Sequence, residues 1–380
     1  MANAQLKDEL IAYSKSIGVD KIGFAAADPF LELKERLIKQ KKLGYQSGFE
    51  EQDIDKRVYP DLHLRGAKTI ISIALAYPSK MKNPPRSTKK ERRGIFCRAS
   101  WGLDYHVILR ERLKKIEQFI QQRVPGAKTL SMVDTGALSD RAVAERAGIG
   151  WSGKNCSIIT PEFGSYVYLG EVLTTVYFEP DTPITEQCGS CTKCIDACPT
   201  GALVQGGQLN AKKCISYLTQ TKELIPETYR KKIGNRLYGC DTCQQVCPKN
   251  KGIDHHFHEE MEPEPEIVKP KLLPLLTLSN REFKRTFGHL SGAWRGKHPI
   301  QRNAIIALAH FKDRQALPLL LQLLKEDHRS MIRGTAAWAI GEIGGEEERK
   351  QLESLKKHES DEEVKDEIEK SIQRLRKKSG

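Results

Sequence analysis

The sequence predicts an α+β multidomain protein with an N-terminal α/β domain, a small cysteine-rich domain and C-terminal α-helical repeats. Three observations predict this architecture. Helical and strand-like apolar patterns are mixed over the first part of the chain, eight of the ten cysteines lie between Cys188 and Cys247, and a repeat of about 32 residues fills the C-terminal part. A chain of 380 residues has room for two or three domains. We expect them at 1–180, 181–258 and 259–380.

The N-terminal domain is predicted from the period of its apolar residues. Within 104–122 an apolar residue recurs every three or four positions, which predicts an amphipathic helix. Three runs with a strand-like composition predict β-strands at 69–77, 128–133 and 166–178. The mixed order of these elements leaves the topology of the sheet open.

The C-terminal part is predicted to be helical and repetitive. Residues 259–266 are acidic and contain prolines, which predicts a linker. Beyond it, equivalent apolar positions are Ile300, Ile332 and Val364, then Ala304, Ala336 and Ile368, then Leu308, Ile340 and Ile372. A repeat of this length with helical spacing inside it is typical of stacked helix pairs. It resembles HEAT repeats with a shortened period, and its highly charged last helix suits a terminal cap.

Composition and charge limit the class of protein. The apolar segment 69–78 is far too short to span a bilayer, and the N-terminus lacks a basic start followed by an apolar run. We therefore expect a cytoplasmic protein without a membrane anchor, in which cysteines stay reduced. The formal net charge of +13 favours a polyanionic partner such as nucleic acid.

Basic residues gather in three segments, 80–98, 212–251 and 271–310. Such segments bind phosphates and give affinity with little sequence choice, although any one of them could equally be a solvated basic face. In the third segment aromatic residues are interleaved with the basic ones. The best candidates for contacts to a nucleic-acid backbone are Arg281, Lys284, Arg285, Arg295 and Lys297.

The first cysteine cluster reads CxxCxxCxxxCP from Cys188 to Pro199. This is the spacing of bacterial ferredoxins, in which three cysteines hold one 4Fe–4S cubane and the fourth holds the other. Thiolates are soft ligands that suit iron, and a tight loop can place three of them around one face of a cluster. A pair of zinc sites is the alternative, but the long motif is much more specific than CxxC alone.

A second cluster, from Cys240 to Pro248, has one cysteine fewer, and Cys214 is the natural substitute. Crossed ligation then gives two complete sets and predicts two 4Fe–4S clusters. The first set is Cys188, Cys191, Cys194 and Cys247, and the second is Cys198, Cys214, Cys240 and Cys243. Two neighbouring cubanes conduct single electrons, so we expect a redox site in the N-terminal domain. No GxGxxG follows a strand there, which favours a cofactor other than a nicotinamide.

Four segments together resemble the epoxyqueuosine reductase family over the whole chain. They are 133–155 (VDTGALSDRAVAERAGIGWSGKN), 163–170 (FGSYVYLG), 171–174 (EVLT) and 233–247 (IGNRLYGCDTCQQVC). One departure is Lys249, where the family usually has a large aromatic residue. The resemblance implies a cobalamin in the N-terminal domain and kinship with reductive dehalogenases. It also implies reduction of epoxyqueuosine to queuosine in the anticodon loop of tRNA, an external low-potential electron donor and a monomer.

Opening an epoxide develops negative charge on the departing oxygen, so a positioned acid should help. Asp134 lies at the end of a strand-like run beside Gly136, where a helix cap or turn former is the alternative. The resemblance implies that it is the proton donor, and we expect burial against the corrin to raise its pKa. The resemblance, together with adjacency to cluster ligands, also suggests cobalamin contacts at Arg57, Cys97, Asp134, Ser152, Gly153, Lys154, Ser216 and Asp241.

Two other functions remain open at this point. One is a corrinoid-dependent reductase of small molecules, which the basic segments and the repeats disfavour. The other is an interaction protein without activity, in which eight cluster ligands would have no purpose. Competition by RNA in a turnover assay separates the first from a tRNA enzyme, and any two-electron turnover excludes the second.

Overall fold

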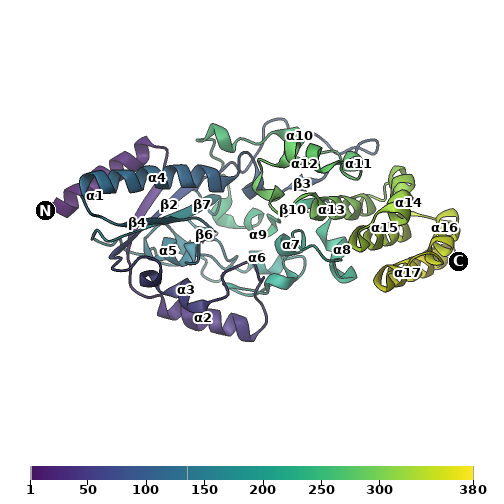
Figure 1. Cartoon of the computed structure of the whole chain (residues 1–380), viewed down its shortest axis with the longest axis horizontal. Coiled ribbons are helices and arrows are strands. Elements are labelled where there is room, and N and C mark those ends of the chain that lie inside the picture. Colours follow the sequence, from purple (N-terminus) through teal and green to yellow (C-terminus); the bar gives the residue numbers. More distant parts are fainter. Residues whose placement is uncertain (1, 135, 380) are drawn as a thin grey trace. The chain divides into compact units, whose positions relative to one another are not determined.

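The computed structural model describes residues 2–134 and 136–379 and divides the chain into two compact units (Figure 1). Unit 1 consists of Met1–Lys80, Gly102–Cys214 and Asp241–Glu262, and unit 2 of Met81–Trp101, Ile215–Cys240 and Pro263–Gly380. The cysteine-rich segment is thus shared between the units. The chain leaves unit 1 after Glu262 and enters unit 2 at Pro263, within the predicted acidic linker. The domain bounds expected from the sequence stay a prediction.

Unit 1 is built around a four-stranded sheet in which every pairing is antiparallel. Its order is β1 (Lys21–Ala26), β2 (Thr69–Ala76), β7 (Val167–Thr174) and β4 (Thr129–Met132). All residues of β2 are buried, as its continuous apolar run requires. The three predicted strands are confirmed as β2, β4 and β7.

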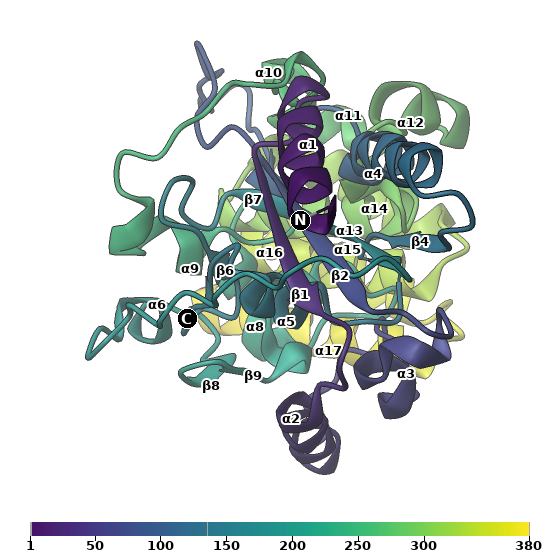
Figure 2. The ribbon, with the colours of Figure 1, turned by 90° about the vertical axis from the view of Figure 1, so that its left-hand side faces the viewer.

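Helices cover both faces of this sheet (Figures 1 and 2). On one face, α4 (Tyr105–Arg123) packs on β7 and β4, and α1 (Ala2–Ser16) packs beside it. The helix predicted within 104–122 is therefore confirmed, and Asp104 caps its N-terminus. On the other face, α5 (Asp140–Arg146) contacts β1, β2 and β7. Away from the sheet, α2 (Leu31–Lys42) packs on α3 (Ile54–Val58).

Short elements complete unit 1. Two short helices of the cysteine-rich segment belong to unit 1, α6 and α9, and they pack against each other. Their bounds and those of the other short elements are η1 (Pro60–Leu62), β5 (Trp151–Ser152), β6 (Ile158–Ile159), α6 (Lys193–Asp196), β8 (Leu203–Gln205), β9 (Gln208–Leu209), η3 (Ala211–Lys213), α9 (Thr242–Gln245), η4 (Pro248–Asn250) and η5 (Glu259–Met261).

Unit 2 contains the helical repeats, and the predicted period is confirmed. Three longer helices carry the equivalent positions, and two shorter helices alternate with them. They are α13 (Lys297–His310), α14 (Leu317–Glu326), α15 (Ser330–Ile343), α16 (Glu346–Lys356) and α17 (Glu362–Ser379). Ile300, Ile332 and Val364 are all buried, so the repeat follows the contact between stacked helices.

The rest of unit 2 shares one hydrophobic core with the repeats. It includes a short parallel pair of strands, β3 and β10. Its elements are β3 (Ile95–Phe96), η2 (Arg98–Ser100), α7 (Ile215–Leu218), α8 (Glu227–Ile233), β10 (Arg236–Tyr238), α10 (Pro265–Val268), α11 (Leu272–Leu275), α12 (Asn280–Phe287), η6 (Ser291–Ala293) and η7 (Arg314–Ala316). Across the described part of both units, no helix has the length and apolar character that crossing a membrane takes.

Two buried polar residues of α13 bind the backbone of the segment between the cysteine clusters. Arg302 donates to the carbonyl oxygens of Leu218, Thr221 and Glu223, and Asn303 donates to those of Thr219 and Leu237, all at 2.7–2.8 Å. Both side chains are fully buried. Because buried carbonyl groups without partners are costly, these contacts fix the path of that segment.

Candidate functional site

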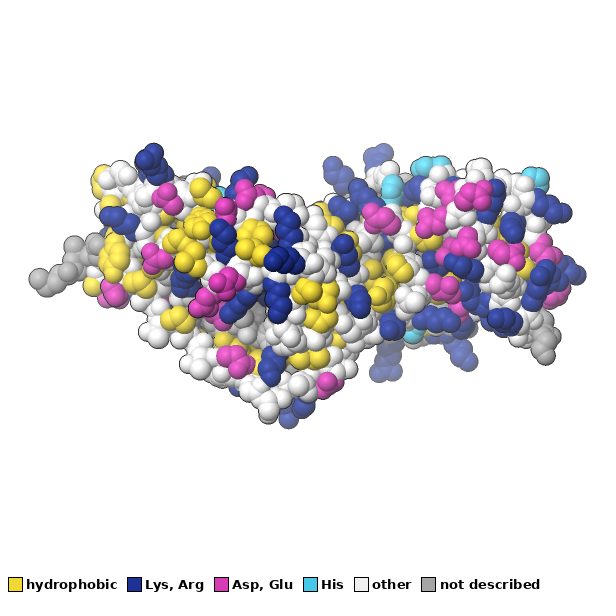
Figure 3. All heavy atoms as spheres, turned by 90° about the horizontal axis from the view of Figure 1, so that it is seen from below, with side chains coloured by type: hydrophobic (Ala, Val, Ile, Leu, Met, Phe, Trp, Pro, Cys, Tyr) yellow, Lys and Arg dark blue, Asp and Glu magenta, His cyan; other side chains and the backbone are white. Residues whose placement is uncertain are grey.

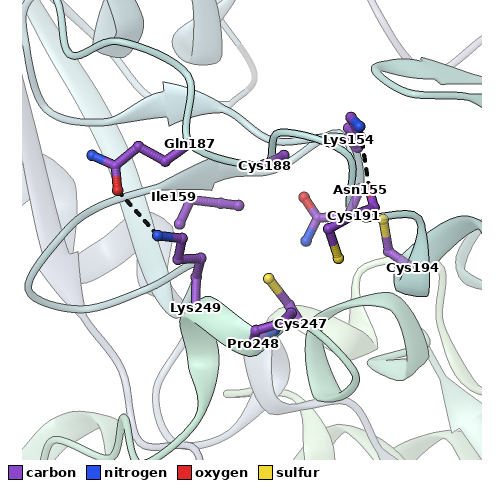
Figure 4. Close-up of a pocket in the computed structure, with 10 residues that line it drawn as sticks. All are labelled: Lys154, Asn155, Ile159, Gln187, Cys188, Cys191, Cys194, Cys247, Pro248 and Lys249. Atoms are coloured by element: carbon purple, nitrogen blue, oxygen red, sulfur yellow. Dashed lines mark hydrogen bonds between the residues drawn. The ribbon is translucent and has the colours of Figure 1, made fainter.

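Four cysteines of unit 1 line one cavity of about 150 Å³ (Figure 4). They are Cys188, Cys191, Cys194 and Cys247, the first of the two ligand sets predicted by crossed ligation. The other lining residues are Lys154, Asn155, Ile159, Gln187, Pro248 and Lys249. In Figure 4 the sulfur atoms of Cys191 and Cys247 point toward each other across the cavity. Four thiols from two distant segments, in a mainly apolar setting, fit a 4Fe–4S cluster.

Local structure holds the loop that carries the first three ligands. The N–H of Cys191 donates to the carbonyl oxygen of Cys188 at 3.0 Å, which closes a turn, and Cys194 lies in α6. The ammonium group of Lys154 donates to the carbonyl oxygens of Gly189 and Cys191. On the opposite side, Nζ of Lys249 donates to Oε1 of Gln187 at 3.1 Å (Figure 4). Two lysines thus anchor the loop on both sides.

Burial raises the pKa of the Cys188 and Cys194 thiols. Around Cys188, the backbone N–H of Lys154 and the indole of Trp151 act in the opposite direction and favour the thiolate. Since iron binds thiolates, loading this site must displace protons, and iron affinity should fall in acid.

The second ligand set is divided between the units. Cys198, Cys214 and Cys243 belong to unit 1, and Cys240 is the last residue of its segment in unit 2. Although burial acts to raise the pKa of Cys198, backbone N–H groups that include that of Ala202, 3.2 Å from the sulfur, lower it. This set stays a prediction.

Asp134 follows β4 and has a positive φ of 36°, which L-residues rarely adopt. Its side chain is 61% exposed. The hydroxyl of Tyr105 donates to Oδ2 of Asp134 at 2.8 Å, and Nε2 of His106 lies 3.5 Å from the same oxygen. The other ring nitrogen of His106 lies 2.7 Å from Oδ1 of Asp104. Because two carboxylates flank the imidazole, the pKa of His106 is raised to about 9, and it is cationic at neutral pH.

The electrostatic setting of Asp134 differs from the expected one. The contact with His106 is the main cause that lowers the pKa of Asp134, and the hydrogen bond from Tyr105 adds to it, while partial burial opposes both. The pKa of Asp134 is therefore lowered in the chain alone, and the rise expected from burial against a corrin stays a prediction. Sequence reasoning missed Tyr105 and His106, although their place directly after the helix cap Asp104 was a usable signal.

Replacing His106 by Gln is expected to raise the pKa of Asp134, because the carboxylate loses its cationic neighbour. Carbon-13 NMR of labelled aspartate would measure the change, and Tyr105→Phe should have a smaller effect. The raised pKa of His106 also makes the stability of the folded protein depend on pH. Since the folded-state pKa of His106 is raised from 6.5 to about 9, its contribution is complete below pH 6.5 and is lost as the pH rises through about 9. An unchanged Asp134 titration in His106→Gln would contradict this assignment.

Arg57 and Asp134 both interact with Asp140. Arg57 is half-buried, and burial lowers its pKa, as does the charge of Arg141, whereas Glu50 and Asp140 oppose this. Asp140 in turn accepts the backbone N–H of Asp134 at 3.0 Å. The structure therefore brings Arg57 and Asp134, both predicted from the sequence, into one polar neighbourhood of unit 1.

Strand β5 and the turn after it hold three further predicted cofactor contacts. The N–H and hydroxyl of Ser152 donate to Glu145, and the N–H of Gly153 donates to the carbonyl oxygen of Ser157. With Lys154 bound to the cluster loop, these donors are engaged inside the chain. By contrast, Nδ2 of the neighbouring Asn155 is buried without a partner among the described residues.

The remaining predicted cofactor contacts are distributed over both units. Asp241 is buried at the N-terminus of α9 in unit 1, and Ser216 lies in α7 of unit 2. Cys97, also in unit 2, packs against Gly239, where an added Cβ would lie 2.2 Å from its sulfur. Gly239 has a φ of 71°, so both its space and its backbone require glycine.

Three of the predicted nucleic-acid contacts form an exposed basic face on α12. Arg281, Lys284 and Arg285 are exposed, while Phe283 and Phe287 of the same helix are buried in the core. The other two candidates are half-buried and bound within unit 2. Nε of Arg295 donates to the carbonyl oxygen of Gln220 at 3.2 Å, and Nζ of Lys297 to that of Leu278 at 2.8 Å. Over the repeats, the face drawn in Figure 3 carries basic and acidic side chains side by side.

A ferredoxin-like cysteine site in a mixed α/β chain defines an iron–sulfur oxidoreductase, and comparisons with known proteins agree. Residues 187–250 match a 4Fe-4S double cluster binding domain, 297–373 match HEAT repeats, and 57–135 match Epoxyqueuosine reductase QueG, DUF1730. The epoxyqueuosine reductase of Bacillus anthracis is 66% identical and covers 98% of both chains. The chain belongs to the epoxyqueuosine reductase family.

Solved structures of relatives match nearly the whole chain. An epoxyqueuosine reductase with an epoxyqueuosine-modified tRNA-Tyr stem loop is 66% identical, with a TM-score of 0.97 over 98% of this chain and 99% of that one. Another, from Bacillus subtilis, has its Asp134 catalytic loop swung out of the active site. It is 66% identical, with a TM-score of 0.96 and the same coverage.

Proposed function

We propose that this chain reduces epoxyqueuosine in the anticodon loop of tRNA to queuosine, the last step of queuosine biosynthesis. The observation that carries the proposal is the likeness, over 98% of the chain, to a reductase bound to an epoxyqueuosine-modified stem loop. The reaction takes two electrons and two protons. Both carbon–oxygen bonds of the epoxide break, and the oxygen leaves as water.

Two 4Fe–4S clusters would supply electrons one at a time from an external low-potential donor. The first cluster is held by the four cysteines of the cavity in unit 1. The second is held by Cys198, Cys214, Cys240 and Cys243. The enzyme acts as a monomer on this proposal.

Cobalamin is the proposed cofactor between the clusters and the substrate. The unpartnered Nδ2 of Asn155 and the half-buried Arg57 supply donors that suit the amide and phosphate oxygens of such a cofactor. When bound, cobalamin supplies a strongly reducing cobalt centre. Residues that would hold it are Arg57, Cys97, Asp134, Ser152, Gly153, Lys154, Ser216 and Asp241, together with Asn155.

Asp134 delivers the proton to the departing epoxide oxygen. Its exposed carboxyl group can reach a substrate, while Tyr105 and His106 hold its orientation. The positive charge of His106, 3.5 Å away, stabilises the carboxylate that remains after proton transfer. Because the pKa of Asp134 is lowered in the chain alone, this role requires the bound cofactor and substrate to raise it, as burial against a corrin would.

The proposal is tested with protein purified anaerobically with cobalamin supplied. About eight irons and one cobalt per chain, together with conversion of an epoxyqueuosine-containing stem loop, are the expected result. Iron without cobalt would overturn the cobalamin assignment and direct the search to a flavin. An enzyme that carries both metals but leaves the modified stem loop unchanged would overturn the substrate.

Reversing the charge of Arg281, Lys284 and Arg285 to Glu is expected to weaken stem-loop binding and its salt dependence. Each lost phosphate contact should reduce the slope of log K against log salt by roughly 0.7–0.9. Fluorescence anisotropy at several salt concentrations measures this. A matched triple reversal at the exposed Lys325, Lys350 and Lys357 serves as control. Equal slopes for both triple variants would show that α12 is only a solvated face.

A further inference from the structure

Glu171 is a buried acid that the proposed function does not use. It lies in β7, in register with Ser72 of β2 and Met132 of β4, and is 1% exposed. Among the described residues, neither of its carboxyl oxygens receives a hydrogen bond from a donor, and no basic side chain forms an ion pair with it. A buried ionised carboxylate in such a setting is very costly, so Glu171 must hold a proton.

The neighbour of Glu171 is a second acid, Asp140, at the start of α5. The two carboxyl groups are within hydrogen-bonding reach of each other. Two carboxylates are acceptors only, so this contact requires one proton between them. Burial, with the nearby acids, raises the pKa of Glu171 well above its ordinary range and that of Asp140 to about 6. The pair therefore titrates as one unit.

Asp140 connects this pair to the proposed catalytic acid. Its Oδ2 accepts the backbone N–H of Asp134 at 3.0 Å, at the residue whose φ is 36°. A residue in this sparsely populated region persists only when its surroundings hold it. We propose that Asp140 and Glu171 are positioning residues, a proton-sharing carboxyl pair that holds the backbone of Asp134 in place. Its importance for catalysis rests on the proposed role of Asp134.

The charged groups around the pair are few and come from several elements. Arg57, in α3, interacts with Asp140 through its charge, and Asp134 adds a second negative charge next to Asp140. From α4, Tyr105 and His106 engage Asp134 rather than the pair. From β2 comes only the hydroxyl of Ser72, which is buried without a partner among the described residues. None of these groups replaces the shared proton.

The shared proton is tested by thermal unfolding at several pH values, independently of activity. Because the folded-state pKa values are raised, the protonated pair stabilises the native state in acid, and this contribution is lost as the pH rises through about 6 and above. Glu171→Gln replaces the proton by a permanent N–H donor. Between roughly pH 5 and 8, its Tm should fall about 5 °C less than that of the wild type.

The exposed Glu162, which pairs with Lys21, provides the matched control, and Glu162→Gln should follow the wild-type curve. Parallel curves for Glu171→Gln and the wild type would overturn the shared proton. Iron content is measured for each variant to show that the chain is folded and loaded.

The positioning role is tested by kinetics. Asp140→Ala removes the acceptor for the N–H of Asp134 and should lower kcat about 10–100-fold with an unchanged Kd for the modified stem loop. Asp140→Asn keeps an oxygen acceptor and should recover most of this loss. Wild-type kcat in Asp140→Ala would overturn the positioning role. If Asp134→Asn were fully active as well, the proposed role of Asp134 as the acid would be wrong. The unfolding curves would still test the carboxyl pair independently.

Discussion

Replacing Asp134 by Asn is expected to lower the turnover of epoxyqueuosine in a stem loop by about 10²–10⁴-fold. Asparagine has nearly the same size and can still accept the hydroxyl of Tyr105, but its amide N–H is far too weak an acid to protonate the departing oxygen. Since the side chain is exposed and is not a cluster ligand, iron content and stem-loop binding should stay at wild-type levels, and cobalamin should still bind through its other proposed contacts. Single-turnover assays with iron and cobalt analysis measure all of these.

Asp8→Asn is the matched control, because Asp8 is an exposed acid on α1. It should leave every quantity unchanged. Full turnover by Asp134→Asn with both cofactors bound would remove this residue from the chemistry and direct attention to His106 as the proton source.

Replacing Cys247 by Ala is expected to abolish turnover and to lower the iron content from about eight to about four per chain. Cys247 completes the first ligand set from a distant part of the sequence, and three thiolates from the loop alone leave one iron of the cubane exposed. Electron paramagnetic resonance of the reduced protein distinguishes one remaining cluster from two.

The matched control for this variant is Cys156→Ala. Cys156 lies in unit 1, outside both ligand sets and outside the lining of the cysteine cavity. Eight irons in Cys247→Ala would contradict crossed ligation and favour a ligand set built within each cysteine cluster.

Patterns with a strict period were predictive of the fold. The positions equivalent to Ile300 are buried in α13, α15 and α17, because a stacked helix pair must repeat its contact at every turn of the solenoid. The spacing of the first cysteine cluster predicted that Cys247 joins Cys188, and both line one cavity. Such local patterns can be interpreted from the sequence alone because few folds satisfy them.

The pairing of distant strands and the pKa values of site residues could not be predicted from local sequence patterns. The antiparallel order of the sheet places β7 between β2 and β4, which no local pattern encodes. The pKa of Asp134 depends on His106, which comes from a helix on a different part of the chain. Likewise, Lys154 was expected at the cofactor, and that role stays a prediction. The structure shows its ammonium group bound to the loop of the first cluster.

The two buried polar residues of α13 have a consequence for how this chain can be divided. Arg302 and Asn303 satisfy carbonyl groups between the cysteine clusters, and the repeats share their core with Phe96 and Leu237. Removing the repeats would leave those carbonyl groups without their hydrogen-bond donors and would expose that core to water. The repeats therefore cannot be exchanged as an independent module. Recombination at their sequence border would destabilise the segment that leads to Cys240.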